Sequence, residues 1–142
     1  MTTPARPCLE DVIDAYARMR GEILAALETE LGPAPWAPSA TGGSLVRSGC
    51  GAGEDPGGER AQLGRWSYPG TYPDAQWPLA VDVVTAAAAA HGFDRVEATA
   101  NRPRDVEIVA HDAWGGQIVF GMAANTILSL STGCHPLRAT RS

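Results

Sequence analysis

Residues 105–132, with the sequence DVEIVAHDAWGGQIVFGMAANTILSLST, decide the fold because apolar and polar side chains alternate along most of the stretch. The alternation predicts three strands separated by short turns, over 105–111, 117–122 and 126–132. Each predicted strand has one apolar face and one mixed face. This pattern is typical of an antiparallel sheet that is covered on one side only.

Further strands are predicted upstream of this stretch. Residues 93–100 form one, and two shorter ones cover 44–48 and 62–68. Residues 51–60 contain few apolar side chains and several glycines, so we expect a surface loop there. The proline-rich segment 33–38 is predicted to be an extended connector.

Two helices accompany the strands. Apolar residues recur at spacings of three and four over 9–31, and Gly32 followed by Pro33 ends this helix sharply. A second helix is predicted over 74–91, with Gly92 as its stop. Its run of alanines would let its backbone lie close to a sheet.

These elements predict an α+β fold, a two-layer sandwich in which two helices cover one face of an antiparallel sheet of about four to six strands. We expect a single domain over residues 9–137, preceded by a disordered lead-in at 1–8 and followed by a tail at 138–142. The length of 142 residues agrees with one domain.

The composition excludes several classes of protein. All eleven basic residues are arginines, and without lysine neither P-loop nucleotide hydrolysis nor Schiff-base chemistry can occur. The formal net charge is −5 and no basic stripe is present, so we expect no nucleic-acid partner. No apolar run approaches the roughly 20 residues that span a bilayer. We expect neither a cofactor nor a catalytic residue.

Cys50 and Cys134 each stand beside a glycine at the end of a predicted strand, where a disulfide could join distant parts of the chain. Such a bond would indicate an oxidising compartment and therefore export. The alternatives are two buried free thiols in a cytosolic protein, or metal binding by both cysteines. The third cysteine, Cys8, has no predicted partner.

The weak candidates for a metal site are Asp105, Glu107 and His111, which share one face of a predicted strand. An outward-facing polar stripe would explain the same three residues. Four tryptophans could line a ligand groove, or could supply core bulk in a chain with two phenylalanines, and they are Trp36, Trp66, Trp77 and Trp114.

The order of several short motifs resembles that of the LppA-like lipoproteins of actinobacteria. The motifs are Tyr-Ala-Arg-Met-Arg at 16–20, Pro35-Trp36, Ser-Gly-Cys at 48–50, Trp66, His-Gly-Phe at 91–93 and Thr-Gly-Cys at 132–134. The resemblance covers residues 9 to about 137 and implies a small cell-envelope protein of unassigned function. It therefore implies a location in the cell envelope or outside the cell.

The N-terminal segment departs from this family pattern. Such lipoproteins carry a signal peptide and a lipobox ending in the acylated cysteine, whereas Arg6 and Pro7 precede Cys8 here. We therefore do not assign lipidation to Cys8. Membrane association is expected only with a lipidation signal upstream of Met1, and a true start at Met1 would predict a cytoplasmic protein.

Three functional hypotheses follow. The first is a non-enzymatic cell-envelope domain that binds an envelope protein or ligand, or has a structural role, and is closed by a Cys50–Cys134 disulfide. The second is a small intracellular interaction protein of the immunity type, which the acidic charge would suit. The third is a metal-dependent enzyme that uses Asp105, Glu107 and His111.

Overall fold

The computed structural model describes residues 6–40, 42–50, 57–102 and 104–137. Within these ranges the chain forms two α-helices, one 3-10 turn and seven strands. The helical elements are α1 (Leu9–Leu31), η1 (Asp74–Gln76) and α2 (Trp77–Ala89). The strands are β1 (Ala37–Pro38), β2 (Val46–Gly49), β3 (Glu59–Tyr68), β4 (Arg95–Arg102), β5 (Asp105–His111), β6 (Gln117–Met122) and β7 (Thr126–Ser131).

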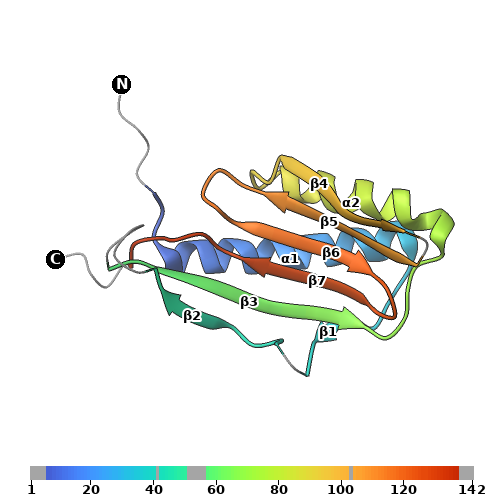
Figure 1. Ribbon diagram of the computed structural model, residues 1–142, viewed down its shortest axis with the longest axis horizontal. Coiled ribbons are helices and arrows are strands. Elements are labelled where there is room, and N and C mark those ends of the chain that lie inside the picture. The colour runs from blue at the N-terminus through green and yellow to red at the C-terminus, as the bar shows by residue number, and fades with distance from the viewer. Residues whose placement is uncertain (1–5, 41, 51–56, 103, 138–142) are drawn as a thin grey trace.

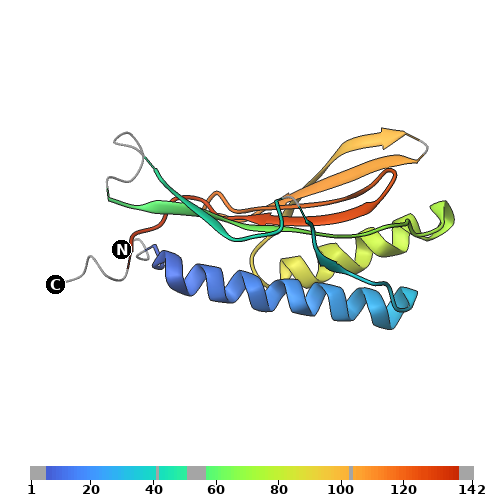
Figure 2. The same ribbon diagram turned by 90° about the horizontal axis from the view of Figure 1, so that it is seen from below.

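The strands form one antiparallel sheet in the order β1-β3-β7-β6-β5-β4, with β2 also paired to β3. Both helices lie on the same face of the sheet (Figures 1 and 2), so the fold is the predicted two-layer α+β sandwich. The predicted number of strands is one too low. The additional strand is β1, which pairs only with Ser67 and Trp66 of β3 and lies within the predicted connector.

The core fills the space between the helices and the sheet. From α1, Met19, Ile23 and Leu27 are fully buried, and they pack with Phe120 and Leu128 in a single cluster with the sheet. Alanines and a valine supply the buried positions of α2, which are Ala80, Val84 and Ala88. Small side chains at these positions agree with the predicted close approach of this helix to the sheet.

The other sheet face is not covered by any described helix (Figure 2). We call it the outer face, and on the three central strands it is formed by every second residue, of which Val109 and Gly121 are themselves buried. These residues include Glu107, Val109 and His111 of β5, Gln117, Val119 and Gly121 of β6, and Ile127, Ser129 and Ser131 of β7. Its small, polar and aliphatic side chains give the mixed face that the alternation predicts.

Most predicted element boundaries shift by only a few residues. The helix predicted over 9–31 is confirmed in full as α1. Strand β3 starts at Glu59, inside the predicted loop, because this residue pairs with Gly49 on one side and bridges to His135 on the other. Residues 51–56 of that loop lie outside the described residues.

Residues 6–8 of the predicted disordered lead-in instead make specific contacts. The backbone oxygen of Pro7 accepts a hydrogen bond from His135 Nδ1 at 2.9 Å, and the side chain of Cys8 is buried next to Asp11. The backbone N–H of Leu9 then donates to the oxygen of Pro136 at 2.8 Å. The start of α1 is therefore fixed to the segment that follows β7. Residues 1–5 and the predicted tail at 138–142 lie outside the described residues.

Candidate functional site

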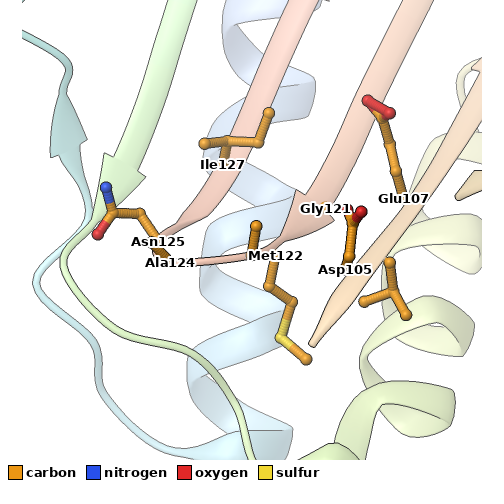
Figure 3. Close-up of a pocket in the computed structure, with 9 residues that line it drawn as sticks. Asp105, Glu107, Gly121, Met122, Ala124, Asn125 and Ile127 are labelled. Carbon is orange, nitrogen blue, oxygen red and sulfur yellow. The ribbon is translucent and has the colours of Figure 1, made fainter. Parts of the chain in front are cut away.

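A pocket of about 340 Å³ opens on the outer face where β5 begins and β6 ends (Figure 3). We call it the outer pocket. Its lining residues come from three neighbouring strands and the β6–β7 turn, and they are Asp105, Val106, Glu107, Gly121, Met122, Ala123, Ala124, Asn125 and Ile127. The volume lies at the lower end of the range of small-molecule sites.

Gly121 creates the outer pocket by having no side chain. It pairs with Glu107 on β5 and with Ile127 on β7, and these two side chains flank the gap. A Cβ atom at this position would lie 2.8 Å from the backbone oxygen of Val106 and 3.2 Å from Cβ of Glu107. Any larger residue would therefore both fill the pocket and push the strands apart.

The polar part of the outer pocket is acidic. Asp105 Oδ2 lies 3.6 Å from Arg102 Nη2, in a pair whose side chains are both at least half exposed. Glu107 accepts a hydrogen bond from Thr99 Oγ1 at 3.1 Å. An ion pair so open to water contributes little energy, and the two carboxylates are the charged groups among the described lining residues of the pocket. Beside them, Ile127 and Gly121 form an apolar floor.

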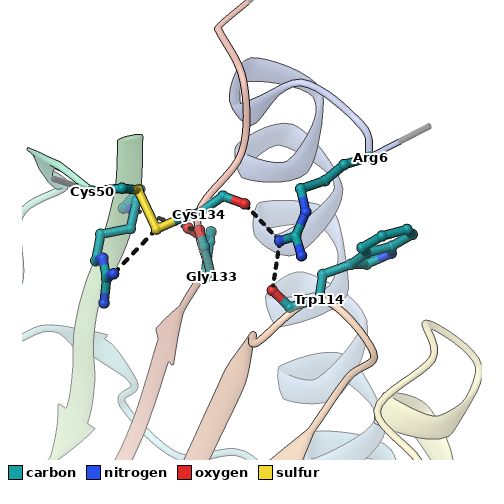
Figure 4. Close-up of a disulfide and its surroundings, with 8 residues drawn as sticks. Arg6, Cys50, Trp114, Gly133 and Cys134 are labelled. Atoms are coloured by element: carbon teal, nitrogen blue, oxygen red, sulfur yellow. Dashed lines mark hydrogen bonds between the residues drawn. A yellow bond between two sulfur atoms is a disulfide. The ribbon is translucent and has the colours of Figure 1, made fainter. Parts of the chain in front are cut away.

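A second cleft, of about 540 Å³, lies at the opposite end of the sheet, beside a disulfide between Cys50 and Cys134 (Figure 4). The two Cα atoms are 6.0 Å apart, within the usual range for a disulfide. Arg6 donates from Nη1 to the backbone oxygens of Cys134 at 2.6 Å and Trp114 at 3.1 Å. Its guanidinium also lies over the Trp114 ring, 5.0 Å from the centroid.

The β5–β6 turn next to this cleft is organised by a buried carboxylate. Asp112 accepts hydrogen bonds from the backbone N–H of Trp114 at 2.9 Å and of Gly116 at 2.6 Å, and a third from the hydroxyl of Tyr16 on α1. Burial raises the pKa of Tyr16 above its ordinary value, and the hydrogen bond to Asp112 and its charge add to the shift. Tyr16 therefore remains a neutral donor that fixes α1 to the end of the sheet.

The structure does not bring the predicted metal candidates together. Asp105 pairs with Arg102, Glu107 bonds to Thr99, and His111 Nε2 lies 3.1 Å from Oε1 of Glu97. Asp105 and His111 lie at opposite ends of β5, and six residues of extended strand span about 20 Å. Within the described ranges, no group of three His, Cys, Asp or Glu residues could hold a metal ion.

The four tryptophans do not line a common groove. Trp36 and Trp66 contribute to one small hollow beside α1, where Trp66 lies under the guanidinium of Arg20 at 4.8 Å. Trp77 stacks on Phe120 with 5.1 Å between the ring centroids, and Trp114 lies at the disulfide end under Arg6. Each tryptophan thus packs against its own local neighbours.

The sequence predicts neither the outer pocket nor the contacts of Arg6, of Asp112 or of Arg60, whose Nη2 lies 3.1 Å from Cys134 Sγ. The signal for the pocket is a glycine inside a predicted strand, Gly121, which is typical of a position that another group approaches closely. The signal for Asp112 is its place before Ala-Trp-Gly-Gly, because an aspartate at the start of a turn often accepts hydrogen bonds from the backbone that follows. Nothing local marks Arg6 and Arg60, which reach the disulfide from distant parts of the chain.

Comparisons with known proteins agree with this architecture. A family model described as LppA, a lipoprotein confined to pathogenic Mycobacterium, matches residues 2–138. The crystal structure of the lipoprotein LppA from Mycobacterium tuberculosis is 11% identical, with a TM-score of 0.71 over 94% of this chain and 80% of that chain. A DUF4853 family protein from Actinomyces odontolyticus is 16% identical, with a TM-score of 0.70 over 97% of this chain and 74% of that chain.

At these identities the two structures establish a shared fold and nothing more about the site. No curated protein sequence matches the chain significantly. No helix in the described part of the chain is long and apolar enough to cross a membrane.

Proposed function

The chain belongs to the LppA family of lipoproteins, and from this membership we propose that it is a non-enzymatic binding domain of the cell envelope whose ligand site is the outer pocket. The family description associates the chain with the envelope, and a disulfide suits an oxidising compartment.

The position of the outer pocket is the observation that carries this proposal. The pocket is lined by residues where β5 begins and β6 ends. Figure 1 shows that this end of the sheet lies opposite the start of α1. At the other end, Arg6 and Leu9 hold the start of the domain against the segment after β7. A tether attached ahead of Arg6 would therefore leave the outer pocket at the end of the domain that is farther from the attachment point.

The chemistry of the lining indicates the class of ligand. Asp105 and Glu107 favour a cation, and the floor at Gly121 and Ile127 favours an apolar body next to it. The ligand class that we propose is therefore an amine or guanidinium on a short apolar stem, such as a basic side chain of an envelope protein.

Benzylamine tests the proposal, with benzyl alcohol as the uncharged probe of the same shape. We expect benzylamine to shift the backbone amide resonances of residues 105–107 and 121–127 in a saturable way, and benzyl alcohol to bind more weakly. Asp105→Asn and Glu107→Gln are each expected to weaken benzylamine about twofold to fivefold, because exposed ion pairs contribute up to about 1 kcal/mol.

Glu97→Gln is the matched control. Glu97 lies on the edge strand β4, where it pairs with His111, and it does not line the outer pocket. Its affinity for benzylamine should equal that of the parent protein. Ala124→Phe should abolish binding by filling the mouth of the pocket, since Ala124 is exposed and the change does not disturb the core. Equal binding of the two probes, or shifts that map elsewhere, would contradict the proposal.

A further inference from the structure

The disulfide joins the two segments that flank the first residue of β3. Glu59 pairs with Gly49, directly before Cys50, and bridges to His135, directly after Cys134. The bond therefore closes across the end of one strand, and the two sulfurs belong to different segments with different surroundings (Figure 4).

The surroundings of Cys134 favour a negative charge on its sulfur. Arg60 Nη2 lies 3.1 Å from Cys134 Sγ, and Arg6 Nη1 donates to the backbone oxygen of the same residue at 2.6 Å. A guanidinium beside a cysteine stabilises the thiolate over the thiol. Glu59, the residue before Arg60, carries a negative charge that would disfavour a thiolate nearby. Arg47 Nε lies 2.9 Å from Glu59 Oε1, and this ion pair offsets the charge of Glu59.

Cys50, rather than Cys134, is the cysteine that is more accessible to an external thiolate. Cys134 is 7% exposed, whereas Cys50 is partly exposed at the end of β2. A thiolate attacks a disulfide in line with the S–S bond, so an attack on Cys50 Sγ comes from the side away from Cys134. Cys134 lines the second cleft, but with 7% of its surface exposed it offers an external thiolate less access than Cys50 does.

We propose that Cys50 is a thiol-exchange site with a fixed direction. A small external thiolate forms a new S–S bond to Cys50 Sγ, the Cys50–Cys134 bond breaks, and its electron pair remains on Cys134 Sγ as a thiolate beside Arg60. Cys50 thus carries the more accessible sulfur and Cys134 the better leaving group, so attack at Cys50 is favoured over attack at Cys134. In the reverse step the Cys134 thiolate attacks Cys50 Sγ, restores the disulfide and expels the external thiolate.

Reduced glutathione tests this direction on the oxidised full chain. The reaction is quenched with acid, free thiols are alkylated, and the sites are read by mass spectrometry after cleavage at arginine. Cleavage separates the cysteines, because arginines 18, 47, 60, 104 and 138 place Cys8, Cys50 and Cys134 in three different peptides. We expect glutathione on the Cys50 peptide and the alkylated thiol on the Cys134 peptide.

Substitution of Arg60 tests the cause of the direction. Arg60→Gln is expected to slow capture about threefold to tenfold, because the leaving thiolate loses a charge-assisted hydrogen bond. Arg60→Lys should keep most of the parent rate, and Arg18→Gln, which removes one exposed arginine from α1, should keep all of it. Glutathione found mainly on Cys134, equal amounts on both cysteines, or an unchanged rate in Arg60→Gln would overturn the proposal. The location of the adduct in the parent protein decides the question even if Arg60→Gln fails to fold.

Discussion

The hydrogen bond between Tyr16 and Asp112 provides a direct test of how α1 is fixed to the sheet. Tyr16 is 6% exposed and Asp112 is 5% exposed, so neither group can exchange its partner for bulk water in the folded protein. Tyr16→Phe removes one donor to the carboxylate and leaves the two backbone donors of the β5–β6 turn in place. Asp112→Ala removes the acceptor of all three.

The expected magnitudes follow from these contacts. A hydrogen bond to a charged group is worth about 1.5–3 kcal/mol, so Tyr16→Phe should lower the free energy of unfolding by about 2 kcal/mol. Asp112→Ala should cost about 4 kcal/mol, because two buried donors and one part-buried donor lose their acceptor at about 1–3 kcal/mol each. The double variant should cost little more than Asp112→Ala alone, which gives a coupling of about 2 kcal/mol.

Urea denaturation of the oxidised protein at neutral pH measures all four free energies of unfolding. Tyr72→Phe is the matched control, because Tyr72 is also buried but its hydroxyl has no hydrogen-bond partner in the described part of the chain. That substitution should be neutral or stabilising. A coupling below about 0.5 kcal/mol, or equal effects of the two Tyr→Phe changes, would refute the argument that this bond anchors α1.

Three further predictions concern the rest of the fold. Replacing Cys50 and Cys134 with alanine should lower the free energy of unfolding by about 4–5 kcal/mol in the chain-entropy treatment of a loop of 84 residues, and urea denaturation without reductant measures the loss. Burial raises the pKa of Tyr72 to about 12 from 10.0, so the unfolded chain loses this proton first, and ionisation of Tyr72 should destabilise the fold as the pH rises from 10.0 toward about 12. Denaturation midpoints across this pH range should fall more steeply in the parent than in Tyr72→Phe, and parallel curves would contradict the assignment. Gly133→Ala should cost about 1–3 kcal/mol in the same denaturation assay, since the new Cβ would lie 1.9 Å from a backbone oxygen, whereas Gly21→Ala meets no atom within 4 Å and should gain up to about 1 kcal/mol.

Local patterns predict the parts of the fold that local interactions determine. Helix α1 begins and ends where the periodicity and the Gly32–Pro33 stop place it. The β5, β6 and β7 strands follow their period-two alternation because each residue's face depends only on its parity along the strand. Strand β1 is not predicted, because its two residues are too few to show an alternation. They form a strand only through their pairing with β3.

The candidate sites depend on contacts between strands, which local sequence patterns predict less well. Asp105, Glu107 and His111 share a strand face as predicted, but they are spread along the length of the strand. Each of them has its partner on β4. The pairing of Cys50 with Cys134 depends on where β2 and β7 end, and strand ends can be read approximately from the sequence. The outer pocket depends on which residues stand on either side of Gly121, and that requires the register of three strands.

The two ends of the sheet differ in a way that bears on both proposals. At the disulfide end, the covalent bond, the Pro7–His135 contact and the Asp112 hydrogen bonds connect α1, β2, the β5–β6 turn and the segment after β7. At the other end, the outer pocket is bordered by exposed side chains and a short turn, with no comparable cross-links among its described residues. A ligand at the outer pocket therefore contacts none of the residues that make these cross-links. If the disulfide exchanges at Cys50, the rigid end loosens without any contact to the outer pocket. Benzylamine affinity should consequently be the same for the oxidised protein and for the form that carries glutathione on Cys50.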